Sequence, residues 1–376
     1  MKIYYWCPYL TNIATIGSVI RSIKSILKYD NSKKIKEVSI LNASGEWDFL
    51  KKNSPNLKIQ NLYPFSFHKF LFKEGMIQSR LSFLIIFLIN FFPLIFKIRK
   101  KKPQYLIVHL LTILPIILSP ILSKNTKIIL RVSGLPKLTF IRKTIWKIFS
   151  KYIYKVTAPT EATLRLLKNS RIFKNDKIFL LRDPIISENE INISKKVKIE
   201  KKFRNKKFFL SIGRLTGQKN FSFLIKMFAK YEKIINVDYL LIIGEGEEKS
   251  KLQKMINKLR CKKKIFLLGF KKNVFNYINQ CTTLISTAEY EDPGFTLIEA
   301  AYLKKRIITS LVKNGPLEMK KNGNLCCFFD FNNQRSFLNA IKKSKKKDLN
   351  RVKNAYKYSK KFMLFPHYQN LIKILN

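Results

Sequence analysis

The strongest candidates for chemistry lie in one acidic segment of an otherwise basic chain. Only 23 of the 376 residues are Asp or Glu, yet four acidic residues fall within eleven positions: Glu289, Glu291, Asp292 and Glu299. The intervening Pro-Gly pair interrupts any helix. We therefore expect Glu291 on a loop after a strand and Glu299 about one turn into the following helix. Carboxylates in these places can accept hydrogen bonds from the hydroxyl groups of a ligand.

The residues between the two carboxylates suit a phosphate. The amides of Gly294, Phe295 and Thr296 lie at the start of the predicted helix, where free N–H groups and the helix dipole attract anions. A phosphorylated, hydroxyl-rich ligand fits, with a sugar on one side and a ribose on the other. Helix capping by acidic residues is the simpler explanation, but it accounts for only one or two of the four groups.

A second candidate segment places two cations directly after an apolar strand. Gly213 lets the chain turn sharply where the strand ends, and Arg214 and Lys219 then stand at the start of the next helix. Guanidinium and ammonium groups at a helix N-terminus suit a diphosphate. The alternative is that both are ordinary surface cations, since the chain contains 74 Lys and Arg.

Two further strands end in glycine. Leu241–Gly246 closes on a Gly-x-Gly, which is a weak phosphate signal that a tight turn explains about as well. Phe266–Phe270 ends in Gly269-Phe270, where the backbone can approach a planar base. A strand ended by a simple glycine turn is at least as good an explanation of the second case.

These candidates need strands and helices to position them, and the chain alternates between the two. Strands are predicted in the first half at 2–6, 37–41, 58–62, 105–109, 127–132 and 153–158. In the second half they are predicted at 208–212, 239–243, 265–268, 283–287, 306–310 and 326–329, with helices between them. Such alternation favours parallel sheets of the α/β class.

The organisation along the chain predicts two successive α/β domains. A polar stretch over 187–207, dense in Lys, Glu and Asn, is the best candidate for a linker between them. We expect one domain at 1–185 and a second at 186–348. A helical segment over 349–376 is expected to pack back on the first domain.

At its acidic segment the chain resembles glycosyltransferase family 4, whose members are retaining enzymes of the GT-B fold. It matches the family's Glu-x7-Glu motif at Glu291 and Glu299, with the Gly-Phe pair at Gly294-Phe295. It also matches the family's Gly-Arg…Lys motif, in the expected order and at about the expected distance. The resemblance is strongest over 208–310 and traceable over the N-terminal half.

The resemblance implies a role for each matched residue. Arg214 and Lys219 would hold the donor diphosphate together with the 294–296 amides, and Glu299 would bind the ribose. Glu291 would bind hydroxyl groups of the transferred sugar as a catalytic residue. In the first half the family often has a histidine after a strand facing the donor, and His109 is so placed. Gly17, expected in the loop after the first strand, resembles the glycine of the family's diphosphate-binding loop. Gly269 and Phe270 are the candidates for the base.

The implied reaction is hexosyl-type transfer from a nucleotide sugar, with retention of configuration, to a glycan or lipid-linked acceptor of cell-surface polysaccharide or lipopolysaccharide synthesis. Transfer passes through an oxocarbenium-like state, and two cations at a helix N-terminus can stabilise the departing diphosphate without a metal or other cofactor. No Asp-x-Asp occurs in the chain. A sugar-nucleotide epimerase of the same fold is the nearest alternative.

The net charge of +51 admits other partners. A nucleic-acid binder is the alternative from a different class, but the basic residues run through the whole chain and no reading module is identifiable. We therefore expect no specific nucleic acid. Five scattered cysteines and three histidines far apart in sequence, His68, His109 and His367, support neither a zinc site nor a disulfide framework. A reducing cytosol is the expected compartment.

Two apolar runs bear on membrane contact. Leu81–Phe96 is followed by five basic residues within 97–102, and it is short for a spanning helix. Attachment to an anionic membrane surface and an ordinary core helix explain it equally well; a hairpin crossing twice is the minority explanation. The second run, Tyr105–Leu122, predicts a buried strand leading into a helix. We expect a cytoplasmic protein, peripheral on the inner face of the cytoplasmic membrane.

Overall fold

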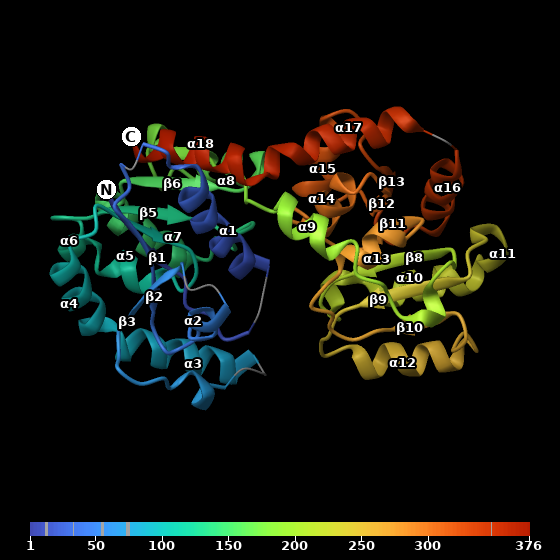
Figure 1. The fold of residues 1–376 in the computed structure, drawn as a ribbon, viewed down its shortest axis with the longest axis horizontal. Helices are drawn as coiled ribbons and strands as arrows, with labels where there is room; N and C mark the ends of the chain where they lie inside the picture. The colour runs from blue at the N-terminus through green and yellow to red at the C-terminus, as the bar shows by residue number, and fades with distance from the viewer. Residues whose placement is uncertain (12–13, 33, 54–55, 73–75, 347) are drawn as a thin grey trace. The chain divides into compact units, whose positions relative to one another are not determined.

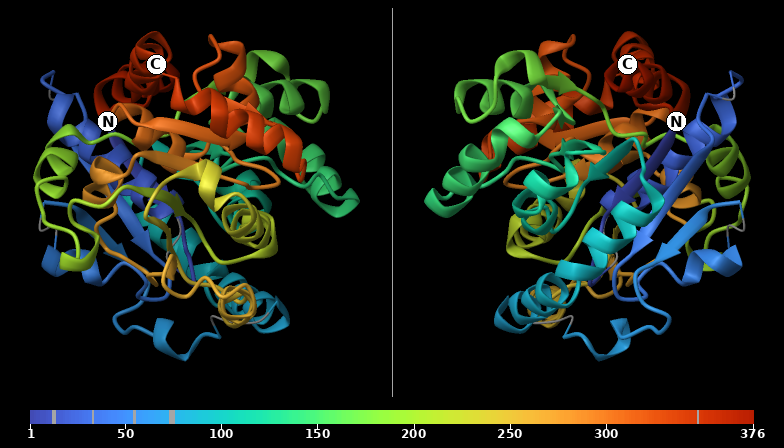
Figure 2. Two further views of the ribbon diagram at one scale, coloured as in Figure 1. Left: turned by 90° about the vertical axis from the view of Figure 1, so that its right-hand side faces the viewer. Right: turned by 90° about the vertical axis from the view of Figure 1, so that its left-hand side faces the viewer.

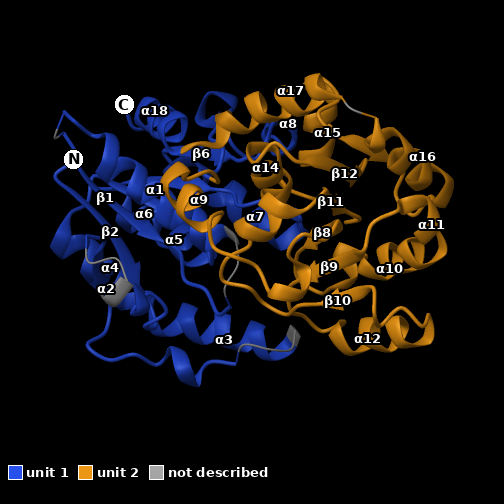
Figure 3. Cartoon of the chain, turned by 45° about the vertical axis from the view of Figure 1, so that its right-hand side comes forward, with its two compact units in different colours: residues 1–184, 364–376 blue, residues 185–363 orange. Residues whose placement is uncertain are grey.

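The computed structural model describes residues 1–11, 14–32, 34–53, 56–72, 76–346 and 348–376. The chain divides into two compact units. Unit 1 comprises 1–184 and 364–376, and unit 2 comprises 185–363 (Figure 3). The chain therefore passes from one unit to the other twice, and the predicted C-terminal segment 349–376 is shared between them.

Unit 1 contains, among its described residues, one parallel sheet of seven strands in the order β3-β2-β1-β4-β5-β6-β7 (Figure 1). The strands are β1 (Lys2–Trp6), β2 (Glu37–Asn42), β3 (Lys58–Asn61), β4 (Tyr105–Val108), β5 (Lys127–Arg131), β6 (Lys155–Ala158) and β7 (Ile178–Leu180). The helices are α1 (Ala14–Tyr29), α2 (Phe49–Asn53), α3 (Met76–Ile89), α4 (Phe91–Lys101), α5 (Ile113–Ile117), α6 (Ser119–Leu122), α7 (Phe140–Phe149), α8 (Glu161–Asn169) and α18 (Leu364–Leu375).

Unit 2 contains, in its described part, a second parallel sheet of six strands in the order β10-β9-β8-β11-β12-β13. The strands are β8 (Phe208–Ile212), β9 (Tyr239–Ile243), β10 (Ile265–Leu267), β11 (Thr283–Ser286), β12 (Arg306–Ser310) and β13 (Cys327–Phe329). The helices are α9 (Glu188–Ser194), α10 (Phe221–Lys230), α11 (Glu232–Ile235), α12 (Lys249–Lys258), α13 (Phe275–Gln280), α14 (Phe295–Tyr302), α15 (Gly315–Lys321), α16 (Gln334–Lys345) and α17 (Leu349–Ser359).

Both sheets are covered on two faces, because successive residues of a strand point to opposite sides. In β1, Ile3 and Tyr5 join a core with α1, α2 and α18, whereas Tyr4 and Trp6 join a core with α3 to α8. In unit 2 one core involves α9, α13, α14 and α17 and the other α10, α12 and α16. Figure 2 shows the parallel strands of unit 1 from two further sides. The predicted α/β architecture with two parallel-sheet domains is confirmed.

The predicted linker over 187–207 is wrong. Residues 188–194 form α9, and Ile191, Ile199 and Phe203 are buried in a core of unit 2. The Phe203 ring packs edge-on against Phe266 with 5.2 Å between ring centroids. A few apolar residues spaced among many lysines are enough to pack this stretch against unit 2. The high average polarity of the stretch led to the wrong prediction.

The apolar run Leu81–Phe96 forms the end of α3 and the start of α4. Among the described residues no single helix is long and apolar enough to cross a membrane. Ile77–Ile89 and Phe91–Lys101, bent by 48° at their junction, meet that criterion only together. The second run forms β4 followed by α5 and α6, as predicted.

Candidate functional site

The acidic segment joins β11 to α14 at the carboxyl end of the second sheet. The carboxylate of Glu291 lies in this loop and is buried, with the residue 7% exposed. Gly294 has a φ of 88° and precedes the helix, which begins at Phe295, so the first amides of α14 face the loop. Glu299 lies in the second turn of α14 and is 9% exposed. The strand–loop–helix arrangement predicted for this motif is the one observed.

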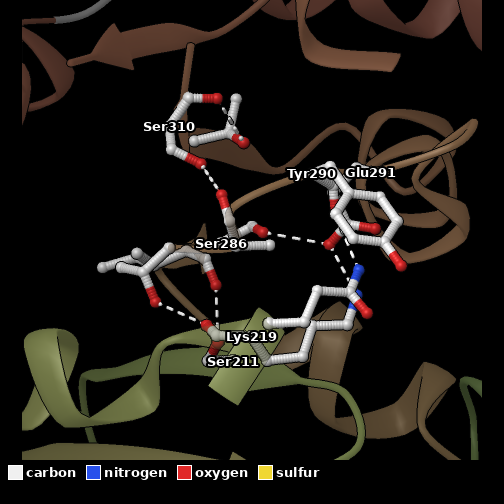
Figure 4. A network of polar contacts seen from close by, with 11 residues as sticks. Ser211, Lys219, Ser286, Tyr290, Glu291 and Ser310 are labelled. Atoms are coloured by element: carbon white, nitrogen blue, oxygen red, sulfur yellow. Dashed lines mark hydrogen bonds and ion pairs between the residues drawn. The ribbon is translucent and has the colours of Figure 1, made fainter. Parts of the chain in front are cut away.

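The two candidate motifs meet in an ion pair. Lys219 Nζ lies 2.7 Å from Glu291 Oε1, and Ser286 Oγ donates a hydrogen bond of 3.2 Å to the same oxygen (Figure 4). Both partners of the pair are largely shielded from water, with side chains 18% and 9% exposed. A shielded ion pair with a further hydrogen bond is oriented much more firmly than a surface pair. The structure therefore brings together a cation and a carboxylate from separate motifs.

Gly213 makes room for the lysine of this pair. A Cβ atom at position 213 would lie 3.1–3.3 Å from three carbons of the Lys219 side chain, so the methylene stem passes directly over the glycine. Lys219 ends a short 3₁₀ turn, η5 (Gly217–Lys219), and Arg214 lies exposed between the strand and that turn. The cations thus come from one strand–turn segment, but only Lys219 is anchored to Glu291.

Backbone and side-chain hydrogen bonds join the cationic segment to the acidic loop. Thr287 Oγ1 donates to the Lys219 carbonyl at 3.0 Å. Gln218 Nε2 donates to the Tyr290 carbonyl at 2.9 Å, and the Glu289 N–H donates to the Gln218 carbonyl at 2.8 Å. The two segments therefore form one cross-linked platform.

Two buried serines anchor the strand end from which the acidic loop starts. Ser211 Oγ, in β8, donates to the Ile285 carbonyl at 2.6 Å, and Ser310 Oγ, in β12, donates to the Ala288 carbonyl at 2.5 Å (Figure 4). Because β8 and β12 are the neighbours of β11, these bonds fix the loop from both sides. The sequence analysis missed both, since a serine in a strand carries no distinguishing signal.

A third loop, between β12 and α15, supports the acidic loop from the other side. The Gly315 N–H donates to the Glu291 carbonyl at 2.9 Å, and Asn314 Nδ2 donates to Asp292 Oδ2 at 2.9 Å. A Cβ atom at position 315 would lie 1.9 Å from the Pro293 carbonyl oxygen. Sequence reasoning overlooked this support, although an Asn-Gly pair four residues after a strand end was a readable signal.

The Gly-x-Gly after β9 has a packing role. A Cβ atom at Gly244 would lie 1.8 Å from the Gly213 carbonyl oxygen, and one at Gly246 would lie 2.4 Å from that of Leu215. The Leu215 N–H donates to the Glu245 carbonyl at 2.8 Å. The two glycines therefore let the β9 loop lie directly against the segment that carries Arg214.

The candidate base-binding residues follow β10 at the same edge. Gly269 has a φ of 68°, and its carbonyl accepts a hydrogen bond of 3.0 Å from the Gly244 N–H. The ring of Phe270 is exposed. Since β10, β9, β8, β11 and β12 are consecutive in the sheet, their loops form one continuous carboxyl-end rim.

The remaining candidates lie in unit 1. His109 follows β4 and is buried beside Tyr5, with 6.0 Å between the ring centroids. Burial, and then the charge of Arg131, lowers the pKa of His109 well below its usual range, so the ring is neutral. Neither of its ring nitrogens has a hydrogen-bond partner among the residues that the structure describes.

Gly17 does not lie in the loop after β1, where it was predicted. It lies in the first turn of α1, because the apolar residues Ile16, Val19 and Ile23 already follow the helical spacing that packs this helix on the sheet. A Cβ atom at position 17 would meet only the guanidinium of Arg21, at 3.2 Å. The loop itself includes residues 12–13, which lie outside the described residues.

Sequence reasoning also missed a buried polar network in unit 1. Arg131 pairs with Asp183 at 2.5 Å, and Ser18 Oγ donates to the same carboxylate at 2.7 Å. His367 Nε2 lies 2.8 Å from Ser22 Oγ, and its Nδ1 lies 2.7 Å from the Arg182 carbonyl oxygen. This network attaches α18 to α1 and to the segment after β7. In the part of the chain that the structure covers, no three His, Cys, Asp or Glu residues are arranged to hold a metal ion.

Comparison with known proteins agrees with this architecture. Residues 192–362 match the model of the family described as "Glycosyl transferases group 1". An uncharacterized glycosyltransferase of Methanocaldococcus jannaschii is 33% identical over 241 residues, which is 59% of this chain and 59% of that protein. The N-acetylgalactosamine-N,N'-diacetylbacillosaminyl-diphospho-undecaprenol 4-alpha-N-acetylgalactosaminyltransferase of Campylobacter jejuni is 28% identical over 151 residues, 40% of each chain. The chain thus matches about half the length of these relatives.

The crystal structure of the Anabaena protein HepE in complex with UDP has the same fold. It superimposes with a TM-score of 0.71 over all of this chain and 99% of that one, at 13% identity. At this level of identity the likeness establishes the fold alone. The predicted arrangement of two Rossmann-like domains of the GT-B type is therefore confirmed.

Proposed function

We propose that this chain, which carries a group 1 glycosyltransferase domain in a GT-B fold, moves a hexose-type sugar from a nucleotide sugar to a glycan or lipid-linked acceptor, with retention of configuration. The ion pair of Lys219 with Glu291 beside the N-terminus of α14 carries the proposal. It places a cation, a carboxylate and helix amides in one rigid platform. A donor that is both phosphorylated and rich in hydroxyl groups requires these three elements.

The diphosphate of the donor is assigned to the cationic side of this platform. Arg214 is exposed at the rim, and Lys219 is held by its partner, so together they supply two positive charges. The amides at Gly294, Phe295 and Thr296 add N–H donors at the start of α14. Gly17, at the start of α1, is assigned a supporting place at the diphosphate.

The sugar and the ribose are assigned to the two glutamates. Both described contacts of the Glu291 carboxylate go to Oε1, and we assign Oε2 to hydroxyl groups of the transferred sugar. Glu299, in the second turn of α14, is assigned to the ribose hydroxyl groups. Gly269 and the exposed ring of Phe270 at the end of β10 are assigned to the base.

The chemical step then depends on stabilising the leaving diphosphate. As the bond from the sugar to the diphosphate breaks, negative charge grows on the phosphate oxygens, and preorganised cations and amides stabilise it. The acceptor oxygen bonds to the anomeric carbon on the face that the diphosphate leaves, and the departing phosphate takes the proton of that hydroxyl group. Configuration is thereby retained. This route needs no metal or other cofactor, and it does not use the two glutamates as the acid and nucleophile of a glycosidase.

His109 is assigned a catalytic role as a neutral hydrogen-bonding group that contacts the donor sugar. The lowered pKa supports this role, because a neutral imidazole offers one donor and one acceptor over the whole physiological range. A general acid with a pKa near 7 would instead impose a pH dependence near neutrality.

We further propose that the enzyme works in the cytoplasm at the inner face of the cytoplasmic membrane, in cell-surface polysaccharide or lipopolysaccharide synthesis, and without a specific nucleic-acid partner. A net charge of +51 supports contact with anionic lipid. The Campylobacter relative, whose name describes an undecaprenol-diphosphate-linked acceptor, supports a lipid-linked acceptor.

A panel of nucleotide sugars tests the donor assignment. A cognate donor at a hundredfold excess over its Kd should stabilise the protein by about 2.7 kcal/mol and raise its Tm. The stabilising donor is then incubated with the protein without an acceptor. Recovery of an epimerised sugar nucleotide would identify an epimerase and overturn the proposal.

The stereochemistry of the product completes the test. NMR coupling constants across the new bond should show the anomeric configuration of the donor. A product with inverted configuration would contradict the retaining mechanism but not the proposed transferase activity. If no nucleotide sugar stabilises the protein, the proposed donor site is contradicted.

A further inference from the structure

Along α3 and at its junction with α4, several apolar side chains are exposed while two polar ones are buried. Ser82 and the following Asn90 are both 0% exposed, whereas Leu84 and Leu88 are 51% and 61% exposed. The buried groups are satisfied locally: Ser82 Oγ donates to the Phe72 carbonyl at 2.9 Å, and Asn90 Nδ2 to the Ile86 carbonyl at 2.8 Å. A helix on the surface of a water-soluble domain normally shows the opposite distribution.

Six of the exposed apolar side chains follow a helical spacing along α3 and α4, and we call this set the apolar stripe. It consists of Ile77, Leu81, Leu84, Leu88, Phe92 and Phe96. The first four recur at intervals of four, three and four residues, which places them on one face of α3. The last two continue the row on α4, one turn apart. Contiguous exposed apolar surface of this kind marks an interaction site.

The opposite face of the same helices holds them on unit 1. Ile86, Leu94 and Ile98 are buried in the core that also contains Trp6 and Leu106 of the sheet. Figure 1 shows α3 and α4 as consecutive helices at the edge of this unit. The stripe is therefore presented outward from a fixed support.

The charged residues of α3 and α4 are all cationic. No Asp or Glu occurs from 76 to 102, while Arg99 and Lys100 are exposed one turn beyond Phe96. Burial, and then the charges of Lys101 and Lys100, lowers the pKa of Lys97, as expected where cations crowd together. Apolar side chains bordered by cations are complementary to a partner with an apolar interior and a negatively charged surface layer. An anionic bilayer has that structure.

We infer that the apolar stripe inserts into the interfacial region of an anionic bilayer, with α3 in the plane of the membrane and the cationic end of α4 on the lipid headgroups. The inference assigns residues to the membrane contact and is independent of donor chemistry. A bilayer is favoured over a second copy of this chain, because a copy would bring its own cations, Arg99 and Lys100 included, to the same interface.

Vesicle flotation tests the inference with the full-length protein. Vesicles of phosphatidylcholine mixed with an equal amount of phosphatidylglycerol should bind the protein, and phosphatidylcholine alone should bind it less. Leu84→Gln/Leu88→Gln should weaken partitioning to the mixed vesicles at least about tenfold, since two half-buried leucine contacts are lost. Arg99→Gln/Lys100→Gln should weaken binding at low salt and have less effect at high salt.

A matched control is available in unit 2. Ile193 and Leu349 are 72% and 78% exposed but belong to no such row, so Ile193→Gln/Leu349→Gln should partition like the unchanged protein. Equal loss in the control, or no flotation of the unchanged protein at low salt, overturns the inference. So does concentration-dependent dimerisation that Leu84→Gln/Leu88→Gln abolishes without any vesicle binding, because the occupant is then a second copy.

Insertion is measured separately with a tryptophan probe. The three native tryptophans, Trp6, Trp47 and Trp146, are all buried in unit 1. Brominated lipid should quench tryptophan fluorescence more strongly in Leu88→Trp than in the unchanged protein. The additional quenching then reports on position 88. Unchanged quenching contradicts insertion. Stabilisation by a nucleotide sugar in each variant shows that the donor site is intact, so loss of membrane contact and loss of the proposed activity are distinguished.

Discussion

At the scale of single residues, the Lys219–Glu291 pair holds the site in a defined state before any donor arrives. The ammonium group and Ser286 fix one carboxylate oxygen, so the position of the other is set in advance. Preorganisation of this kind is what makes electrostatic stabilisation effective. Removing the charge of Glu291 should therefore affect chemistry more than folding.

Glu291→Gln should lower the transfer rate at least about a hundredfold, because the amide neither pairs with Lys219 as a carboxylate does nor accepts hydrogen bonds on both atoms. Steady-state transfer assays measure the effect, and far-UV circular dichroism checks the fold. Glu289→Gln is the control, since this neighbour is exposed and only its backbone N–H contacts Gln218. Equal losses in both variants would show that loop charge, not this carboxylate, matters.

Close backbone approach makes Gly244 a second sensitive residue. Gly244→Ala would put a Cβ atom 1.8 Å from the Gly213 carbonyl oxygen, at a φ of 149°. We expect a loss of about 2–4 kcal/mol of stability and a raised KM for the donor, because the Arg214 segment must move. Thermal unfolding followed by circular dichroism and donor titration measure these effects.

Gly217→Ala provides the matched control for this substitution. A Cβ atom there has no neighbour within 4 Å, and the backbone is not left-handed. Its stability and donor KM should stay close to those of the unchanged protein. A comparable loss in this variant would mean that general loss of glycine flexibility, rather than close packing, limits the segment.

At the scale of elements, α18 illustrates how one helix completes a unit formed mainly by residues far away in sequence. His367 is fully enclosed between Ser22 of α1 and the Arg182 carbonyl, with Arg131 and Asp183 nearby. Burial, and then Arg131, lowers the pKa of His367 to about 3. The helix is thus docked through a neutral histidine.

This docking predicts a pH dependence of stability. The unfolded histidine titrates near its ordinary value of 6.5 and the folded one near 3, so the unfolded chain binds more protons between these values. The contribution is fully present above about pH 6.5 and is lost as the pH falls toward 3, by about 1.4 kcal/mol per pH unit. His109, whose pKa is also lowered, should act in the same direction.

Urea unfolding followed by tryptophan fluorescence measures this effect, because all three tryptophans lie in unit 1. His367→Gln should lower stability at pH 7 and reduce the slope between pH 6.5 and 5, leaving the part due to His109. An unchanged slope in this variant would show that His367 is protonated in the folded state.

At the scale of the whole molecule, charge is the dominant feature. Seventy-four Lys and Arg against 23 Asp and Glu give a net charge of +51. The like charges repel one another in the folded state, and together they attract anionic surfaces. Half-buried lysines over aromatic rings, such as Lys155 over Tyr154 at 4.9 Å, accommodate part of this excess of positive charge.

Self-repulsion predicts that salt stabilises the protein. Raising sodium chloride from low to physiological strength should increase the Tm by several degrees, because the Debye length falls to about 8 Å and screens exposed like charges. Differential scanning calorimetry measures the shift, with sucrose of equal osmolality as the control. A Tm that falls with salt would mean that attractive pairs outweigh repulsion.

The amino-acid sequence was sufficient to predict most strands and helices and the charged residues that they position. Strands β1, β8, β9 and β12 have the predicted bounds, because strands of a parallel sheet buried on both faces contain consecutive apolar residues. It also located the acidic segment and the cations, since the charge and hydrogen-bonding capacity of a side chain do not depend on packing.

Which of these segments contact one another, and which face of each is buried, became visible only in the tertiary structure. Lys219 pairs with Glu291, 72 positions further along the chain, and Gly315 supports the acidic loop from the start of α15. Phe203 turns inward from a lysine-rich stretch, while Leu84 and Leu88 turn outward from an apolar helix. Local hydrophobicity fixes how much a segment can bury. Contacts between segments far apart in the chain select the face that is buried and the partner of each charge.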